Sequence, residues 1–104
     1  MTTAADLLAA LRAATAGLTG AVEVGAGEAT IAWSSSGAPF AVLAGAIVEL
    51  RVGPAIAAAA VRTPDVSGSG RGAEWIAFSP RTLEGPDLDR LLAWFAAAYR
   101  RAGT

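Results

Sequence analysis

The chain has 104 residues, a net charge of −1 and 54% hydrophobic residues, a size and composition that fit a single folded domain over residues 1–104. It contains no Cys and no His, which excludes disulfides, thiolate metal sites and a Ser-His-Asp triad. Every basic residue is Arg, so Schiff-base chemistry on Lys and a Walker A loop are excluded as well.

The first predicted element is an amphipathic helix over residues 4–16. Thr3 is placed to cap this helix, and Asp6, three residues later, gives a pattern close to a capping box. Leucines recur at helical spacing along the segment, and Gly17 and Gly20 end it.

Four short strands are predicted next, at residues 21–24, 28–34, 39–44 and 46–52. Apolar and polar residues alternate along them, as they do in half-buried strands. Residues 25–27 are expected to form the turn between the first two. Connections this short require antiparallel neighbours, because a parallel crossover takes about a dozen residues or more.

A short helix is predicted from Gly53-Pro54 to Thr63-Pro64, since Pro favours the first helical position and the residue before a Pro leaves the helical region. A glycine- and serine-rich connection follows at residues 67–72. A fifth strand is predicted at residues 74–79, where Pro80 ends it.

The C-terminal helix has the clearest pattern in the chain. Pro86 lies at its start, Asp87 and Asp89 lie in its first turn, and Arg100 and Arg101 close it, so these charges complement the helix dipole. Its apolar stripe is Leu88, Leu91, Leu92, Phe95 and Tyr99. Together the elements predict an α+β domain: an antiparallel sheet of about five strands with helices packed on it, in the order α-β-β-β-β-α-β-α.

The stretch DVSGSGRGAEWIAFSP at residues 65–80 raises the question of a phosphate-binding loop. Gly68, Gly70 and Gly72 occupy every second position, unlike the G-x-G-x-x-G pattern. The segment also follows a helix and opens a strand, which is the reverse of the order in dinucleotide-binding folds. We interpret residues 67–72 as a connection, with an anion held by Arg71 as the alternative.

Serines and carboxylates are the other candidates for chemistry. The cluster at residues 34–36 has no His or Lys to act as its base. Glu23, Glu28, Glu49 and Glu74 lie at strand positions opposite the apolar set, a pattern typical of a solvated face, with a carboxylate site for a hard cation as the alternative. No catalytic residue, metal site or cofactor is predicted.

The tryptophans and the single tyrosine are the candidate ligand-binding aromatics. Trp33 and Trp75 lie on predicted strands and Trp94 at the edge of the C-terminal stripe, positions typical of a core, with an interface or a pocket wall as the alternative. A pocket between the sheet and the last helix, with an arginine to hold an acidic group, would be lined by Trp33, Trp75, Trp94, Tyr99, Arg51 and Arg71.

The order of features from Ile31 onward resembles a known type. A strand pair containing PFAVLAGAIVELRVGPAI, a short Ala-rich helix, the strand EWIAFSP and a final helix ending WFAAAYRR are similar to the small bacterial luciferase-domain proteins and, more distantly, to the MmcQ/YjbR-like family. The matching positions are Phe40, Leu43, Val48, Leu50, Pro54, Trp75, Leu92 and Tyr99. The resemblance covers about two thirds of the chain and implies an α+β fold; the His residues usual in the luciferase-domain pattern are absent here.

We expect a non-enzymatic interaction or binding module that self-associates, because a small and unusually apolar chain has difficulty covering all its apolar surface. The alternative is a small-molecule carrier or enzyme with an apolar, aromatic-lined pocket. The expected partners are a second copy, another protein or a small apolar ligand. The charge balance argues against nucleic acid. The lack of a long apolar run and of a signal-peptide pattern argues against a membrane and for the cytoplasm.

Overall fold

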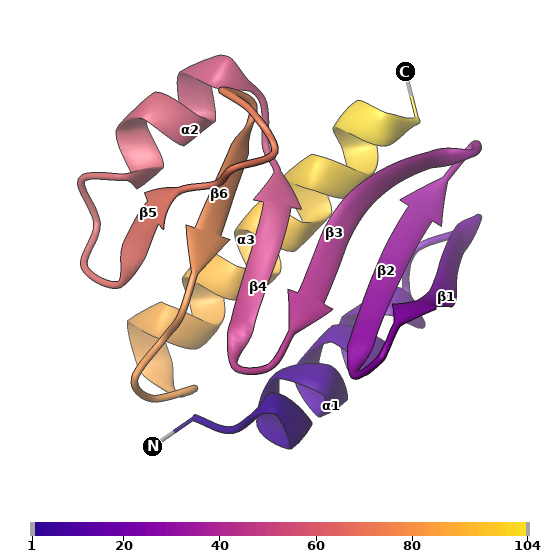
Figure 1. Ribbon diagram of the computed structural model, residues 1–104, viewed down its shortest axis with the longest axis horizontal. Helices are drawn as coiled ribbons and strands as arrows, with labels where there is room; N and C mark the ends of the chain where they lie inside the picture. Colours follow the sequence, from indigo (N-terminus) through magenta and orange to yellow (C-terminus); the bar gives the residue numbers. More distant parts are fainter. Residues whose placement is uncertain (1, 104) are drawn as a thin grey trace.

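The computed structural model describes residues 2–103, which form an α+β fold with one six-stranded sheet (Figure 1). The class and the antiparallel sheet agree with the prediction. In chain order the elements are α1 (Ala4–Thr15), β1 (Ala21–Gly27), β2 (Thr30–Ser35), β3 (Ala38–Ala44), β4 (Ile47–Arg51), α2 (Pro54–Ala60), β5 (Val66–Gly68), β6 (Trp75–Phe78) and α3 (Gly85–Ala102).

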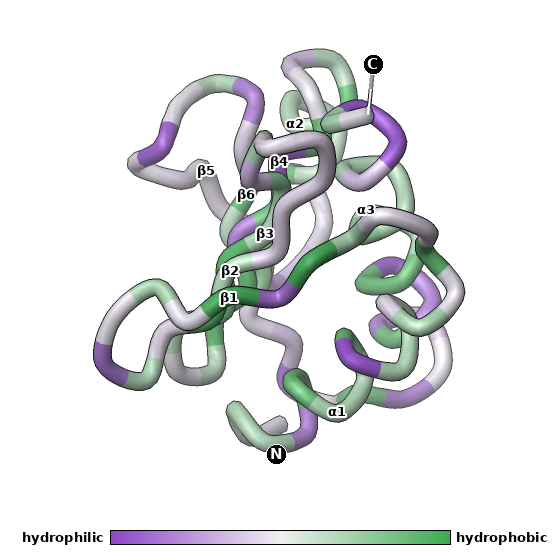
Figure 2. The backbone as a smooth tube through the Cα atoms, turned by 90° about the vertical axis from the view of Figure 1, so that its right-hand side faces the viewer, coloured by the Kyte–Doolittle hydropathy of each residue, from purple (hydrophilic) through white to green (hydrophobic). Residues whose placement is uncertain are grey.

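The strands lie in the order β1-β2-β3-β4-β6-β5, and every neighbouring pair is antiparallel. Helices α1 and α3 pack on the same side of the sheet, behind it in Figure 1 and to its right in Figure 2. Helix α2 packs against β5 and β6. No helix within residues 2–103 combines the length and the apolar character needed to cross a membrane.

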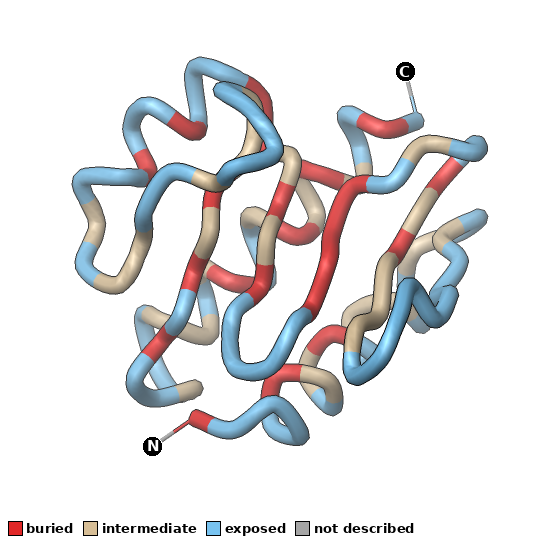
Figure 3. Tube along the Cα trace, viewed as in Figure 1, coloured by how far each residue is buried: buried red, intermediate tan, exposed pale blue. Residues whose placement is uncertain are grey.

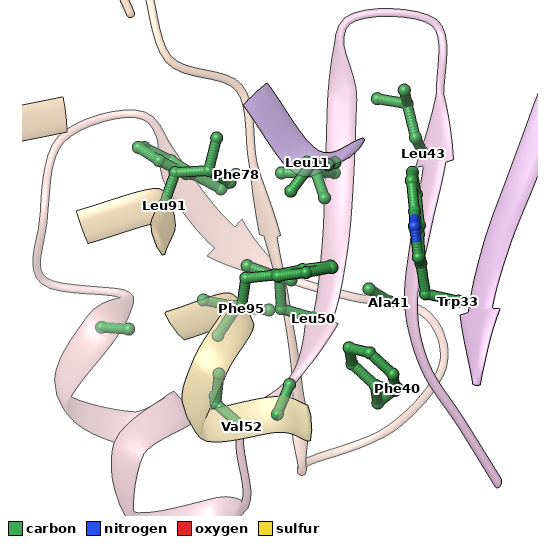
Figure 4. Packing of buried hydrophobic residues seen from close by; sticks show 14 of the residues in the cluster. Leu11, Trp33, Phe40, Ala41, Leu43, Leu50, Val52, Phe78, Leu91 and Phe95 are labelled. Atoms are coloured by element: carbon green, nitrogen blue, oxygen red, sulfur yellow. The ribbon is translucent and has the colours of Figure 1, made fainter. Parts of the chain in front are cut away.

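The core lies between the sheet and helices α1 and α3. Trp33, Ala41, Leu50 and Ile76 form one row across four strands on this covered face, and all four are buried. Helix α3 contributes Leu91 and Phe95, whereas Leu7 and Leu11 come from α1 (Figure 4). On β2, β4 and β6 the residues next to these positions face the opposite side, whereas Phe40, next to Ala41 on β3, also packs against Phe95.

The capping box at the start of α1 is confirmed. The Asp6 amide donates to Thr3 Oγ1 at 3.1 Å, and the Thr3 amide donates to Asp6 Oδ2 at 3.0 Å. In α3 the helix begins at Gly85, so Pro86 occupies the first turn, where its missing N–H costs no helical hydrogen bond.

The sheet has a sixth strand where the sequence pattern predicted a connection. Residues 67 and 68 belong to β5, because Val66, Ser67 and Gly68 pair with Phe78, Ala77 and Ile76 of β6. The first turn is also displaced: β1 continues through residues 25–27, and the chain turns at Glu28-Ala29, where Ala29 has φ 54°. In both cases a neighbouring strand supplies hydrogen bonds that override weak local preference.

Candidate functional site

The six predicted site residues are divided between the two faces of the sheet. Trp33, Trp94 and Tyr99 lie on the covered side, among the residues of the core or packed against it. Arg51 and Trp75 are register partners on β4 and β6, on the face that α1 and α3 leave uncovered, and Arg71 reaches the same face. The sheet therefore separates the residues that the sequence analysis assigned to one pocket.

The aromatic residues of the covered side are packed against one another. Trp33 is fully buried, with its ring centre 5.8 Å from that of Phe95 in an edge-to-face arrangement. Trp94 meets Phe78 in the same way at 5.2 Å. Figure 4 shows Trp33 beside Phe95 and Phe40 in the core. These contacts give Trp33 and Trp94 a packing role.

Tyr99 connects α3 to the segment that precedes β1. Its ring lies 5.9 Å from that of Phe40, and its hydroxyl donates a hydrogen bond to the Thr19 carbonyl. Tyr99 therefore holds the C-terminal helix against residues 80 positions earlier in the chain.

On the uncovered face, the glycine-rich segment is fastened to the sheet by polar contacts. Ser69 Oγ donates to one Glu49 oxygen, and Arg71 Nε donates to the other at 3.1 Å. The Arg71 amide also donates to Ser69 Oγ at 3.1 Å. The Arg71 guanidinium carbon lies 5.5 Å from the centre of the Trp75 ring, within reach of a cation–π interaction. Arg71 thus already faces a carboxylate of its own chain.

Glu74 joins two further arginines near the start of β6. Arg101 donates to Glu74 Oε1 at 2.7 Å, and Arg51 donates to Glu74 Oε2 at 3.2 Å. The hydrogen bonds from Arg101 and then Arg51 lower the pKa of Glu74 below its ordinary value of 4.5. An acidic ligand at Arg51 would have to compete with this carboxylate. Among residues 2–103, no group of three or more metal-binding side chains gathers into a cation site.

An apolar groove runs between α1 and α3 and has a volume of about 480 Å³. Its walls are formed mainly by alanines and leucines: Ala10, Ala13, Ala14, Leu18, Leu88, Leu92, Phe95 and Ala96. The groove lies between two helices, whereas the predicted pocket lay between the sheet and the last helix. None of the six predicted site residues is among those lining it.

The uncovered face carries exposed valines at its β1 edge. Val22 and Val24 of β1 are 53% and 51% exposed, and Ile47 at the start of β4 is 47% exposed. The register partners of Val22 and Val24 on β2 are Ser34 and Ala32, which also belong to this face. Figure 3 shows β1 exposed along almost its whole length, whereas β3, on the far side of β2, is mostly buried.

Glu23 is exposed and lies opposite the apolar residues of its strand, as expected, but those apolar residues face away from the core. The alternation along β1 is present, but Glu23 pairs in register with buried Trp33 and so points to the helix side. There it accepts two hydrogen bonds from Arg12 of α1, at 2.9 Å and 2.8 Å. The valines consequently face outward. The glycines at 25 and 27 were the one local sign of a weakly packed edge strand.

No family model matches the chain, and neither a curated protein nor a solved structure matches it.

Proposed function

We propose that this protein is a non-enzymatic binding domain that self-associates, with β1 and the adjoining part of the uncovered face as its contact surface. The observation that carries the proposal is the exposure of Val22 and Val24 on a strand at the edge of the sheet. Edge strands offer unpaired backbone groups, and exposed apolar residues beside them favour association.

The carboxylates near the uncovered face and at the start of β6 support binding more than catalysis. Glu49 is engaged by Ser69 and Arg71, and Glu74 is engaged by Arg51 and Arg101. A general base or nucleophile needs a reactive group that is available to substrate. These side chains instead hold the β5–β6 connection and the end of α3 onto the sheet.

The exposed valines by themselves support only weak association. Full burial of a valine side chain contributes about 1.5–3 kcal/mol of favourable free energy. Burying the exposed half of Val22 and Val24 in both copies therefore contributes roughly 3–6 kcal/mol to association. Association costs about 4–15 kcal/mol in lost freedom. A stable complex therefore needs further contacts, such as hydrogen bonds along the strand edge.

Sedimentation velocity or light scattering over a concentration series tests the proposal. The range is about 10 µM to 1 mM, where a dimer held by about 4–7 kcal/mol dissociates. We expect the average mass to rise above the monomer mass of 10.4 kDa, and the double variant Val22→Ser/Val24→Ser to stay monomeric. The matched control is Ile56→Ser/Val61→Ser, which changes two exposed apolar residues at α2 and should associate normally. A wild-type monomer throughout the range would refute the proposal.

The groove between α1 and α3 favours a second candidate function, a carrier of a small apolar molecule. Its volume of about 480 Å³ is in the range of ligand pockets, and its walls are apolar. Ala13→Phe would fill it from α1. A panel of medium-chain fatty acids should raise the melting temperature of the wild type and not of Ala13→Phe; equal shifts, or none, would remove this candidate.

The remaining parts of the proposal concern the location of the protein in the cell, its partners and its family resemblance. We place the protein in the cytoplasm, with no cofactor, membrane or nucleic-acid partner; the net charge of −1 supports the last point. The resemblance to luciferase-domain and MmcQ/YjbR-like proteins stays a prediction, supported by the order of elements from Ile31 onward.

A further inference from the structure

We infer that two copies of this chain join their sheets by antiparallel pairing of β1 with β1. The two-fold axis lies midway between the two Val24 residues, so that Val24 of one copy is directly opposite Val24 of the other. The inference rests on the proposed self-association and goes further by naming the strand, the direction and the register. It follows from the geometry of the edge and from where β1 places its charge.

The β1 edge is the longer of the two edges of the sheet. It has seven residues and is paired with β2 on one side, in a register that shifts between Gly25 and Gly27. Figure 2 looks onto this edge, and β1 crosses in front of the other strands with the helices to one side. A Cβ atom added to Gly25 or Gly27 would meet no described atom within 4 Å, so the two faces of this part of the strand are open.

Symmetry limits the possible registers. A two-fold axis perpendicular to the sheet keeps the two uncovered faces on the same side and makes the paired strands antiparallel. In an antiparallel pair, residues directly opposite each other point to the same face of the sheet. The axis must therefore set one residue opposite its own copy, and it cannot fall between two consecutive residues. Near the middle of β1 the choices are Val22, Glu23, Val24 and Gly25.

Charge and overlap select Val24. An axis through Glu23 would set the two Glu23 side chains directly opposite each other, and like charges in that arrangement are destabilising. An axis through Val22 would pair Val24 with Gly20, which lies before the strand begins, and an axis through Gly25 would pair Val22 with Glu28, which lies beyond its end. Val24 is the midpoint of Ala21–Gly27, so this axis gives the longest overlap of the two strands, with the irregularity between Gly25 and Gly27 at its ends.

The Val24 register is also compatible with the side chains on each face. On the uncovered face, the two Val24 side chains would meet each other, and both are half exposed in the single chain. On the helix side, Glu23 would lie opposite Gly25, which has no side chain to oppose it. Arg12 of the same chain binds the Glu23 carboxylate, and in this register no second carboxylate lies directly opposite it.

Single-cysteine cross-linking tests the register, because the natural chain has no Cys. Val24→Cys would place two thiols opposite each other, with Cα atoms about 4.5–5.5 Å apart, a separation that a disulfide spans. Val22→Cys is the matched control: its two copies would lie about 13 Å apart along the strand direction. Ile47→Cys reports random collision from a similarly exposed residue. On mild oxidation, we expect a disulfide-linked dimer for Val24→Cys in large excess over the other two.

A charge exchange at the same position gives an independent result. Val24→Lys and Val24→Glu should each weaken self-association at least tenfold, because like charges would meet at the axis. A mixture of the two variants should form a heterodimer at least as strong as the wild-type dimer. The half-exposed position makes both variants compatible with folding, and circular dichroism at high dilution is the check that they fold.

The outcomes separate the inference from the proposed function. If the wild type associates but Val22→Cys or Ile47→Cys cross-links better than Val24→Cys, self-association stands and the Val24 register is wrong. The same holds if mixing the Lys and Glu variants restores nothing. If the wild type never associates, the proposed function and the inference fail together.

Discussion

Arg12 and Glu23 form a two-pronged ion pair that joins α1 to the edge strand β1. Arg12 Nε lies 2.9 Å from one Glu23 oxygen and Arg12 Nη2 lies 2.8 Å from the other. Parallel hydrogen bonds of this kind are stronger than a single charged contact and fix the orientation of both groups. This pair holds the acidic side of β1 toward the helices and leaves its valines outside.

The first prediction concerns acid stability. The hydrogen bonds from Arg12 lower the pKa of Glu23 below its ordinary value of 4.5, and the Thr3 backbone and side chain do the same for Asp6. A lowered folded-state pKa gives stability that is present above the unfolded pKa and is lost as the pH falls through the folded pKa. Glu23→Gln should therefore melt below the wild type at pH 7, and the two melting temperatures should converge in acid.

Thermal melts between about pH 7 and pH 2.5 measure this difference across the range in which carboxylates titrate. Glu28→Gln is the control, since Glu28 forms no ion pair with the residues described and should follow the wild type at every pH. A gap between wild type and Glu23→Gln that widened in acid would contradict the assignment.

The second prediction compares two tryptophans on opposite faces of the sheet. Trp33→Ala empties a fully buried position against Phe95 and should cost about 3–5 kcal/mol of unfolding free energy. Trp75 is only partly buried, and Trp75→Ala would remove mainly its contacts with Arg71 and α2. This variant should therefore lower the free energy of unfolding by about 1–2 kcal/mol. Urea unfolding of both variants decides the order, and equal losses would mean that Trp75 belongs to the core.

The third prediction concerns Arg71. Its ion pair with Glu49 and its contact with the Trp75 ring are both at the surface, so Arg71→Ala should destabilise the protein by about 0.5–1.5 kcal/mol. A double-mutant cycle of Arg71→Ala with Glu49→Gln should show positive coupling. If ATP or phosphate raised the melting temperature of the wild type and not of Arg71→Ala, the segment would be an anion site after all.

The fourth prediction separates two glycines. Gly53 has φ +95°, and an added Cβ would lie 3.0 Å from the Arg101 guanidinium that binds Glu74. Gly53→Ala should therefore cost about 1–3 kcal/mol. Gly70, in the glycine-rich segment, has open space around it and no positive φ, so Gly70→Ala should be neutral or stabilising by up to about 1 kcal/mol. The reverse order in thermal melts would show that the segment needs Gly70.

The local elements could be predicted because their signals are local. The capping box of α1 and the acidic start and basic end of α3 lie within a few residues of one another. Strand β5 could not be predicted from the sequence. It has only three residues, two of them the small Ser67 and Gly68, and they form a strand only because β6 pairs with them. The predicted turn at residues 25–27 failed for the same reason.

The site was harder to predict because alternation defines two faces of a strand without saying which one the helices cover. In β6 both sets are apolar: Trp75 and Ala77 face one way, Ile76 and Phe78 the other, and the second pair entered the core. The contacts that settle the arrangement, such as Arg71 with Glu49, join residues 22 positions apart. The sequence around each of these residues carries no pattern from which the contacts could be predicted.

The two edges of the sheet differ in length, and this difference limits how large an assembly can become. Joining β1 to β1 leaves a β5 strand at each outer end of the combined sheet, and β5 has three residues against the seven of β1. So short an edge offers few backbone groups to an incoming strand. Raising the protein concentration should therefore saturate at two chains and give no filaments, even though the strand that joins them is open and apolar.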